Sequence, residues 1–328
     1  MAQKLHKGWV AAWLCGLVCL VCWVPPSAVA QTKSVAVLAS EGNAATDALR
    51  IGVRDALKSG GFVEGRNFKF VSEVAPADEE QLSLRARSLV LSRPDVLVAL
   101  SASAAHALML HTKQIPIVFA GVSDPVQAEL VPNWSASGTN VTGVARSLPM
   151  TRRVAFIRQV VPQARRVGVV YNPVDAALMA TVKEFQEELT KAGLLLVEVS
   201  TARAIDMASA ARSLIGKIDV LHTFSDSNTQ TIYPGLVKVA NDAKIPLFAI
   251  DTASVQAGAL GAVVVTDREV GATAGRQVLK ILRGTKPGVI APEFVGKAEL
   301  QLNLGAAKKQ GVTMTDALVK TAVVIAKE

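Results

Sequence analysis

The chain has 328 residues, of which 50% are hydrophobic and 19% are charged, and its mean hydropathy is +0.34. This composition excludes an intrinsically disordered protein, which would be polar and highly charged. The three cysteines, Cys15, Cys19 and Cys22, all lie near the N-terminus. The rest of the chain therefore has no thiolate, which excludes disulfide scaffolds, iron–sulfur clusters, thiolate zinc sites and cysteine nucleophiles there.

The N-terminal segment has the three regions of a secretory signal peptide. Lys4 and Lys7 form a basic start, residues 8–24 are an apolar run, and residues 28–30 (Ala-Val-Ala) form a small-x-small cleavage pattern. We expect cleavage between Ala30 and Gln31 and a mature protein in the periplasm. The alternatives are an uncleaved membrane anchor and a lipoprotein signal, which is disfavoured because no cysteine follows a lipobox.

Removal of Lys4 and Lys7 lowers the formal charge from +8 to +6. The remaining basic residues are scattered in pairs such as Arg152-Arg153, and no basic stripe is interleaved with aromatic side chains. This pattern disfavours a nucleic-acid partner. We expect a monomer that binds a small molecule.

Short β-branched runs alternate with helical stretches along the rest of the chain. Such alternation predicts βαβ units, in which parallel strands are buried between helices on both faces of a sheet. In the first half, strands are predicted at 35–38, 68–71, 95–100 and 117–119, and helices at about 45–57, 82–91 and 103–111.

The same pattern begins again near residue 150. Strands are predicted at 167–171, 194–199, 220–224 and 245–250, and helices at 177–192, at 205–215 and before residue 245. The two halves even share a detail, because Ile115-Pro116 and Ile245-Pro246 each join a helix end to an apolar strand. Proline is tolerated at a strand start. We therefore predict an α/β protein with two similar Rossmann-like lobes.

Catalytic motifs are absent from the sequence. There is no G-x-S-x-G elbow and no Walker A motif, and the first strand–helix turn at residues 39–43 lacks the glycines of a dinucleotide fingerprint. His106 and His111 are five residues apart on one predicted helix, which is a poor spacing for sharing a metal ion. We expect no enzymatic activity, no cofactor and no metal.

Polar residues follow the carboxyl ends of the predicted strands, which is the edge where open parallel sheets bind ligands. The candidate ligand-binding residues are Ser40, Glu41, Ser101, Ala102, Ser103, Ser123, Asp124, Tyr171, Asn172, Asp226, Ser227, Asn228, Thr229 and Asp251. Ser103, Asp124 and Asn228 are also credible helix N-caps. Hydroxyls and helix N-termini suit a carboxylate, and aspartates suit an amine. These candidate residues together predict a zwitterionic ligand, such as an amino acid or a related amine-bearing metabolite.

Several segments carry a family resemblance. Residues 115–126 (IPIVFAGVSDPV), 138–144 (GTNVTGV), 61–67 (GFVEGRN) and 246–251 (PLFAID) resemble the ABC transporter substrate-binding protein family of the tryptophan/tyrosine type, as do the 271–284 helix and Leu302-Asn303. The resemblance covers essentially the whole chain after the signal peptide. It implies a type I periplasmic-binding fold, in which two lobes joined by crossover strands close on a solute.

From this resemblance we expect residues 1–30 to be the signal peptide, 31–142 plus 262–296 to form lobe 1, and 143–261 plus 297–328 to form lobe 2. The crossings should lie near Thr142-Gly143, near Gly261-Ala262 and between Glu293 and Gly296. The sequence departs from the family pattern at residues 101–104, where Ser-Ala-Ser-Ala replaces a Gly-Thr-Pro-Ala-like turn. It also departs at Pro234, where we expect the helix to start late or to kink.

The leading functional hypothesis is a solute-binding protein that delivers a small molecule to an ABC permease in the inner membrane. A sensor that presents its ligand to a membrane receptor would use the same lobes. A third hypothesis is a secreted enzyme with Asp124 and Asp226 as paired carboxylates.

Overall fold

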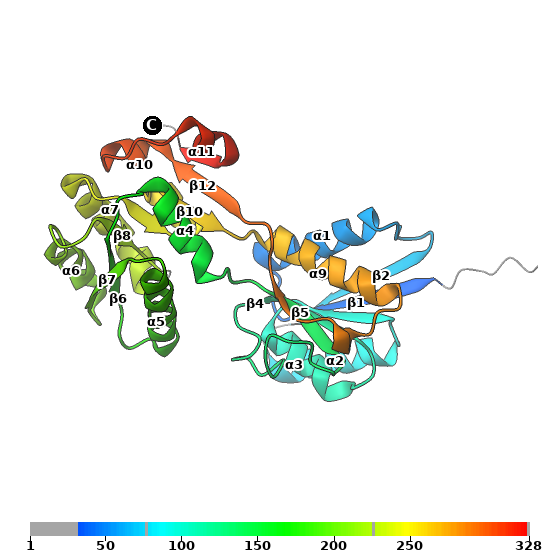
Figure 1. Ribbon diagram of the computed structural model, residues 1–328. Helices are drawn as coiled ribbons and strands as arrows, with labels where there is room; N and C mark the ends of the chain where they lie inside the picture. Colours follow the sequence, from blue (N-terminus) through cyan, green and yellow to red (C-terminus); the bar gives the residue numbers. More distant parts are fainter. Residues whose placement is uncertain (1–31, 76–77, 225–226, 327–328) are drawn as a thin grey trace, which may run out of the picture. The chain divides into compact units, whose positions relative to one another are not determined.

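The computed structural model describes residues 32–75, 78–224 and 227–326. The predicted signal peptide and Asp226 lie outside the described residues. The chain forms two mostly parallel sheets, each with its own helices (Figure 1). We call the first sheet with its helices lobe 1 and the second lobe 2.

Lobe 1 is built on a six-stranded sheet in the order β11-β5-β4-β3-β1-β2, and every pair in it is parallel. Its strands are β1 (Lys33–Ala39), β2 (Phe68–Val74), β3 (Val96–Ala99), β4 (Ile117–Val122), β5 (Val141–Ala145) and β11 (Glu293–Phe294). Its helices are α1 (Ala44–Ser59), α2 (Glu79–Leu91), α3 (Ala102–His111), α9 (Asp267–Leu282) and the 3₁₀ turn η2 (Pro287–Val289).

Helices cover both faces of this sheet, and the alternation along β1 shows why its strands are so apolar. Val35 and Val37 pack with α1 and α9 in one core cluster, whereas Ala36 and Leu38 pack with α2 and α3 in another. Figure 1 shows the two helix layers on opposite sides of the sheet. Successive side chains of a strand point to opposite faces, so a strand covered on both sides reads as a continuous apolar run.

Lobe 2 is built on a seven-stranded sheet in the order β13-β12-β10-β9-β8-β6-β7, in which only the β10–β12 pair is antiparallel among the described strands. Its strands are β6 (Arg166–Tyr171), β7 (Leu195–Ser200), β8 (Val220–His222), β9 (Leu247–Ala249), β10 (Gly261–Val264), β12 (Glu299–Asn303) and β13 (Val323–Ala326). Its helices are α4 (Met150–Val160), α5 (Ala176–Lys191), η1 (Ala204–Asp206), α6 (Met207–Ser213), α7 (Ser227–Ala243), α8 (Thr252–Ala257), α10 (Leu304–Lys309) and α11 (Asp316–Thr321).

The same clamp holds the first strand of each lobe. In lobe 1 the Asp95 carboxylate accepts the Ser34 backbone N–H and the Lys33 ammonium, each at 2.8 Å. In lobe 2 the Asp219 carboxylate accepts the backbone N–H of Arg166 and its guanidinium, each at 2.9 Å. Both aspartates directly precede a central strand, so each one joins the starts of two neighbouring strands.

The clamps perturb both carboxyl groups. Burial alone would raise the pKa of Asp95, but the Lys33 ammonium and the Ser34 N–H hold that pKa below its ordinary value. The Arg166 guanidinium, helped by two backbone N–H groups, holds the pKa of Asp219 below its ordinary value against partial burial. Both aspartates therefore favour the folded state at neutral pH.

The repeated Ile-Pro pairs also have equivalent places in the two sheets. The Leu97 N–H donates to Pro116 O at 2.8 Å, and the Leu221 N–H donates to Pro246 O at 2.9 Å. In both lobes the proline carbonyl thus lies just before the fourth strand and binds the strand beside it. The duplication predicted from the sequence extends to individual backbone hydrogen bonds.

Helices α1 and α9 lie side by side and come unusually close (Figure 1). A Cβ atom on Gly52 would fall well inside contact distance of Arg268 O, and one on Gly271 would do the same with Leu49 O. At Gly275 a Cβ would lie 2.6 Å from Ala56 Cβ. The two backbones can therefore meet only because these positions lack a side chain.

The predicted strands and helices of both halves are present, with ends that differ by a few residues. Two local expectations were wrong. Ser101, not Ser103, is the N-cap of α3, because β3 ends at Ala99 and leaves only one turn before the helix. Helix α7 begins at Ser227 and runs through Pro234, so the late start is wrong, and a kink at Pro234 stays a prediction.

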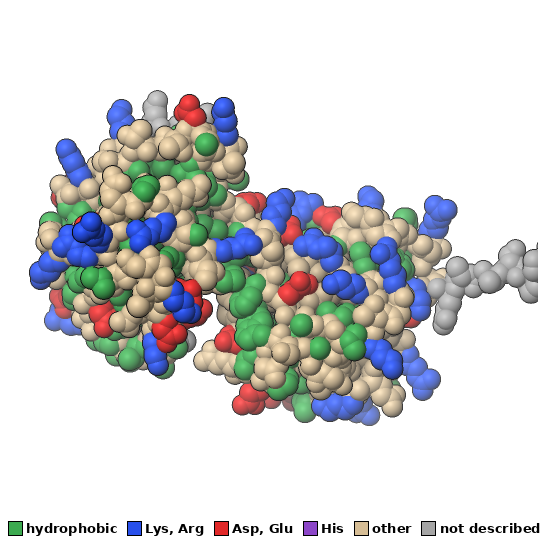
Figure 2. Space-filling model, viewed as in Figure 1, with side chains coloured by type: hydrophobic (Ala, Val, Ile, Leu, Met, Phe, Trp, Pro, Cys, Tyr) green, Lys and Arg blue, Asp and Glu red, His purple; other side chains and the backbone are tan. Residues whose placement is uncertain are grey.

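On the face shown in Figure 2, Lys and Arg side chains are spread over the surface with Asp and Glu among them. Among the residues described, no helix combines the length and the apolar character needed to cross a bilayer.

Candidate functional site

The chain passes between the two sheets three times. The crossings join β5 to α4, β10 to α9, and β11 to β12. All of β5 pairs within the first sheet and all of β10 within the second, so these crossings follow Ala145 and Val264. These positions are a few residues after Thr142-Gly143 and Gly261-Ala262, and the third crossing runs between Phe294 and Glu299.

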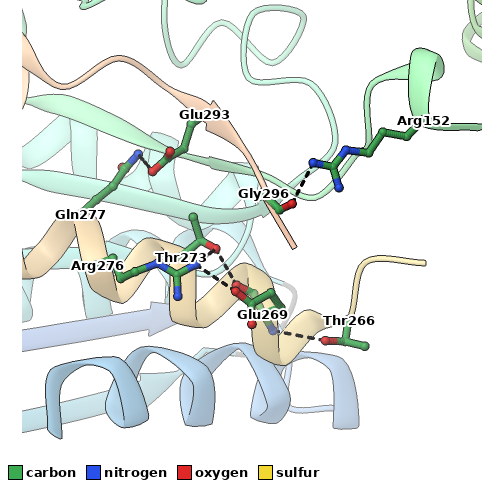
Figure 3. Close-up of polar contacts among 8 residues, drawn as sticks. All are labelled: Arg152, Thr266, Glu269, Thr273, Arg276, Gln277, Glu293 and Gly296. Carbon is green, nitrogen blue, oxygen red and sulfur yellow. Dashed lines mark hydrogen bonds and ion pairs between the residues drawn. The ribbon is translucent and has the colours of Figure 1, made fainter. Parts of the chain in front are cut away.

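Polar contacts hold the crossing segments in place (Figure 3). The Gln277 side-chain amide, which is completely buried in α9, donates to Glu293 Oε1 at 3.0 Å and to Gly143 O at 3.2 Å. Arg152 of α4 donates to Gly296 O at 2.8 Å. One α9 side chain therefore connects two of the strands that lead out of lobe 1.

At the lobe 1 edge, three predicted site residues form a hydroxyl network. Ser40 Oγ lies 2.9 Å from Ser101 Oγ, which lies 3.1 Å from Ser103 Oγ and accepts the Ala104 N–H that begins α3. The predicted residue Ala102 is the first residue of that helix. Two strands distant in the sequence thus bring Ser40 and Ser101 together, as the sheet-edge argument predicted.

Ser40, Glu41 and Ser103 line a cavity of about 1080 Å³ together with side chains from α2 and α3. Its wall also includes Asp78, Glu79 and Glu80 at the start of α2. The lobe 1 cavity is therefore acidic at its polar end and apolar near Leu82, Leu84 and Leu110. Such a wall favours a ligand with a cationic group and an apolar body.

The predicted residues Ser123 and Asp124 follow β4. Asp124 Oδ1 accepts the N–H groups of Val126 and Gln127 at 2.9 and 3.1 Å. The predicted helix N-cap role is wrong, because a turn and not a helix follows; Asp124 instead accepts two N–H groups of that turn. Asp124 is exposed, and no bond to its Oδ2 is seen among the described residues. The Ser123 carbonyl accepts Ser147 Oγ at 2.7 Å, next to the first crossing.

At the lobe 2 edge, Asp251 caps α8 by accepting the Ser254 N–H at 2.8 Å and its hydroxyl at 3.1 Å. Tyr171 ends β6, and its pKa is raised by burial and by the nearby Glu198 carboxylate. Asn172 Oδ1 accepts the Val174 N–H at 3.0 Å. Ser227, Asn228 and Thr229 begin α7. The predicted residue Asp226 lies outside the described residues.

The sequence did not single out a buried group behind this edge. His222, the last residue of β8, is only 1% exposed and lies between the rings of Phe185 and Phe224 at 4.6 and 4.8 Å. Its Nδ1 atom has no hydrogen-bond partner in the part of the chain that is described. Burial, with a smaller effect of the Arg153 cation, lowers the pKa of His222 to about 3.

Arg153 of α4 was also missed as a site residue, although the Arg152-Arg153 pair shortly after Pro149 was visible in the sequence. It is half-buried, it lines a second cavity at the crossings, and its Nε atom is sealed from solvent without a hydrogen-bond partner. Burial lowers the pKa of Arg153 to about 10, and the Glu184 carboxylate offsets this only in part.

The histidines singled out in the sequence have structural partners. His106 Nε2 lies 2.8 Å from Ala128 O, and His111 Nε2 lies 3.0 Å from Ser83 Oγ. Within the described ranges, no three His, Asp or Glu side chains are grouped so that they could hold a metal ion. The polar groups at the two edges can hydrogen-bond and neutralise a charged small molecule.

The family follows from residues 34–325, which match the model of the ABC transporter substrate binding protein family. The chain belongs to this family. Its members are substrate-binding and not catalytic proteins. The resemblance read from the sequence is thus confirmed over nearly the whole described chain.

Individual relatives agree with this assignment. The chain is 30% identical to a tyrosine-binding protein of Clostridioides difficile (strain R20291) over 257 residues, which are 78% of this chain and 74% of that protein. It is similar to the ligand-free, open structure of a substrate-binding protein with adhesive properties from Clostridium difficile, with a TM-score of 0.83, 27% identity, and coverage of 90% of this chain and 100% of the other.

A third relative shows the fold alone. The Streptococcus pneumonia ABC domain in complex with L-Trp has a TM-score of 0.62 and 24% identity, and the match covers 90% of this chain and 99% of that one. Together these structures confirm the predicted type I periplasmic-binding fold with two α/β lobes.

Proposed function

We propose that this substrate-binding protein captures an aromatic amino acid, L-tyrosine or L-tryptophan, and delivers it to an ABC permease in the inner membrane. The observation that carries the proposal is the relationship to a tyrosine-binding protein over most of both chains. The acidic, partly apolar cavity of lobe 1 supports it, because a ligand ammonium and an aromatic ring need such a wall.

The candidate residues at the two strand edges would contact the ligand from both lobes. In lobe 1 these are the hydroxyls of Ser40, Ser101 and Ser103 with the Glu41 carboxylate, and the free oxygen of Asp124 is available to an ammonium. Domain closure about the three crossings would then remove the ligand from solvent. The division into two lobes is part of this proposal. The sequence predicted residues 31–142 plus 262–296 and 143–261 plus 297–328; the strand pairing places the first two boundaries after Ala145 and Val264 instead.

Delivery to a permease requires export, so we also propose that the signal peptide is removed between Ala30 and Gln31 and that the mature chain acts in the periplasm as a monomer. Its apolar run and small-x-small site support this.

The proposal is tested on the mature chain from residue 31, unfolded and refolded to remove any bound ligand. Thermal shift and calorimetry are run with all twenty common amino acids, and with glucose and succinate as controls. L-tyrosine or L-tryptophan at 100 times its dissociation constant should stabilise the fold by about 2.7 kcal/mol. The proposal is wrong if no aromatic amino acid shifts the transition, or if a sugar or a dicarboxylate does so instead.

A further inference from the structure

A cavity of about 430 Å³ lies where the first two crossings meet lobe 2. Its wall includes Arg146 and Asp267 of the crossings, Arg153 of α4, and Asp251 and Thr252 at the carboxyl end of β9. Arg146 and Asp267 neutralise each other through an ion pair of 2.9 Å. The third arginine of the wall, Arg268, is paired with Asp55. Arg153 therefore differs from the other two, because it has no carboxylate partner among the described residues.

Arg153 has almost nothing to bind in the described structure. Its Nη1 donates to Met150 Sδ at 3.5 Å, which is a weak sulfur acceptor, and its Nε has no partner at all. Glu184 is near enough to act through its charge, but no carboxylate of the described residues lies within ion-pair distance of Arg153. A shielded guanidinium without an anion is costly to hold in a folded protein.

The helix that carries Arg153 makes the charge imbalance larger. The N-terminus of α4 has no acidic residue in its first turn, and its N-cap, Pro149, has no side chain that could accept a hydrogen bond. Instead, Arg152 and Arg153 place two cations near the positive end of the helix dipole, where acidic residues are normally favoured. Arg152 is accounted for by its bond to Gly296 O. Arg153 is left facing the cavity.

We propose that Arg153, with the N-terminal turn of α4, binds the carboxylate of the amino-acid ligand. This inference rests on the proposed function, because it requires a ligand that has a carboxylate. A guanidinium can bind a carboxylate through two parallel hydrogen bonds, and a helix N-terminus adds a favourable dipole.

The sheet edges of the two lobes differ in charge, so they would bind different groups of the ligand. The serine network of lobe 1, which we had expected to hold the carboxylate, shares its cavity with Glu41, Asp78, Glu79 and Glu80. These side chains would repel an anion and attract the ligand ammonium. Arg153, a cation of a cavity wall that has no carboxylate partner among the described residues, lies instead at the lobe 2 edge. A zwitterion would therefore have an acidic site on one lobe and a basic site on the other.

The test compares the binding affinity for L-tyrosine with that for L-tyrosinamide, which has the same ring and ammonium but no carboxylate. If L-tryptophan binds more tightly than L-tyrosine, L-tryptophan and its amide are used instead. Calorimetry is run on the wild-type mature chain, on Arg153→Gln and Arg153→Lys, and on Arg165→Gln. Arg165 is an exposed arginine of lobe 2, so its loss removes the same charge away from the cavity. Melting temperatures check that each variant is folded.

The wild type should bind the amino acid at least about 30-fold more tightly than its amide, because a lost charge-assisted contact costs about 2 kcal/mol or more. In Arg153→Gln this preference should fall below about threefold, Arg153→Lys should keep part of it, and Arg165→Gln should keep all of it. Lysine keeps the positive charge but not the two parallel donors of arginine. The reduced preference of Arg153→Lys for the amino acid over its amide therefore tests the proposal even if Arg153→Gln does not fold.

The outcomes are separable. If the wild type binds the amino acid and Arg153→Gln or Arg153→Lys retains the full preference over the amide, the role of Arg153 is overturned and the proposed function stands. An equal loss in Arg165→Gln would also overturn it, because the effect would then be general electrostatics. If the wild type binds neither aromatic amino acid, the proposed function fails, and the assignment of Arg153 fails with it.

Discussion

The buried His222 makes a sharp prediction about stability and pH. The perturbation is His222→Phe, which keeps an aromatic ring between Phe185 and Phe224 but removes the group that titrates. In the folded protein burial lowers the pKa of His222 to about 3, whereas in the unfolded chain the ordinary value is about 6.5. Between these two values the unfolded chain binds a proton that the folded protein does not bind.

The magnitude follows from that difference. Stability contributed by neutral His222 is fully present above about pH 6.5 and is lost as the pH falls, at up to about 1.4 kcal/mol per pH unit. Between pH 7.5 and pH 4.5 the wild type should therefore lose about 2.7 kcal/mol through this one side chain. A folded-state pKa one unit higher would change this sum by only about 0.1 kcal/mol, because pH 4.5 is still above it.

The assay is urea unfolding of wild type and His222→Phe at four pH values from 7.5 to 4.5. Any effect of the substitution on packing is already present at pH 7.5, so the difference in unfolding free energy between the two proteins should shift by about 2.7 kcal/mol in favour of the variant as the pH falls. Titration of the exposed carboxylates affects both proteins equally. Parallel stability curves over this range would refute the reasoning, since they would mean that His222 accepts a proton in the folded state.

Two further predictions concern the packing and the clamps. A glycine-to-alanine change inside a helix normally stabilises it by up to about 1 kcal/mol. In Gly52→Ala the new Cβ would instead clash with the α9 backbone, so we expect a loss of unfolding free energy of about 1–3 kcal/mol. The control Gly296→Ala, which has open space around the new Cβ, should change it by less than about 0.5 kcal/mol in the same denaturation assay. Asp219→Asn should cost about 1–2 kcal/mol at pH 7. Because the pKa of Asp219 is lowered in the folded protein, this difference from wild type should be fully present above about pH 4 and should shrink as the pH falls below that value. A difference that grows as the pH falls would contradict this.

Local pattern was enough to predict most of the scaffold. The apolar run at Val35 to Leu38 and the helix face that includes Leu49 and Val53 predicted β1 and α1, since burial on both faces of a sheet and on one face of a helix leaves these periods in the sequence. The meeting of Ser40 and Ser101 was also predictable, because parallel strands present their carboxyl ends at one edge. Capping was less certain, since Ser101 and Ser103 are chemically equal candidates and only the end of β3 selects between them.

The sequence by itself thus determined the family and the two α/β lobes, and it predicted that a ligand would be bound at the sheet edges. Tertiary structure decided which polar groups at those edges are already satisfied. Asp124 and Asp251 accept the backbone N–H groups of the turns that follow them, whereas Arg153 and His222 are shielded without a full set of partners. The physical reason is that desolvation and pairing depend on neighbours distant in the chain, which no local period or motif records.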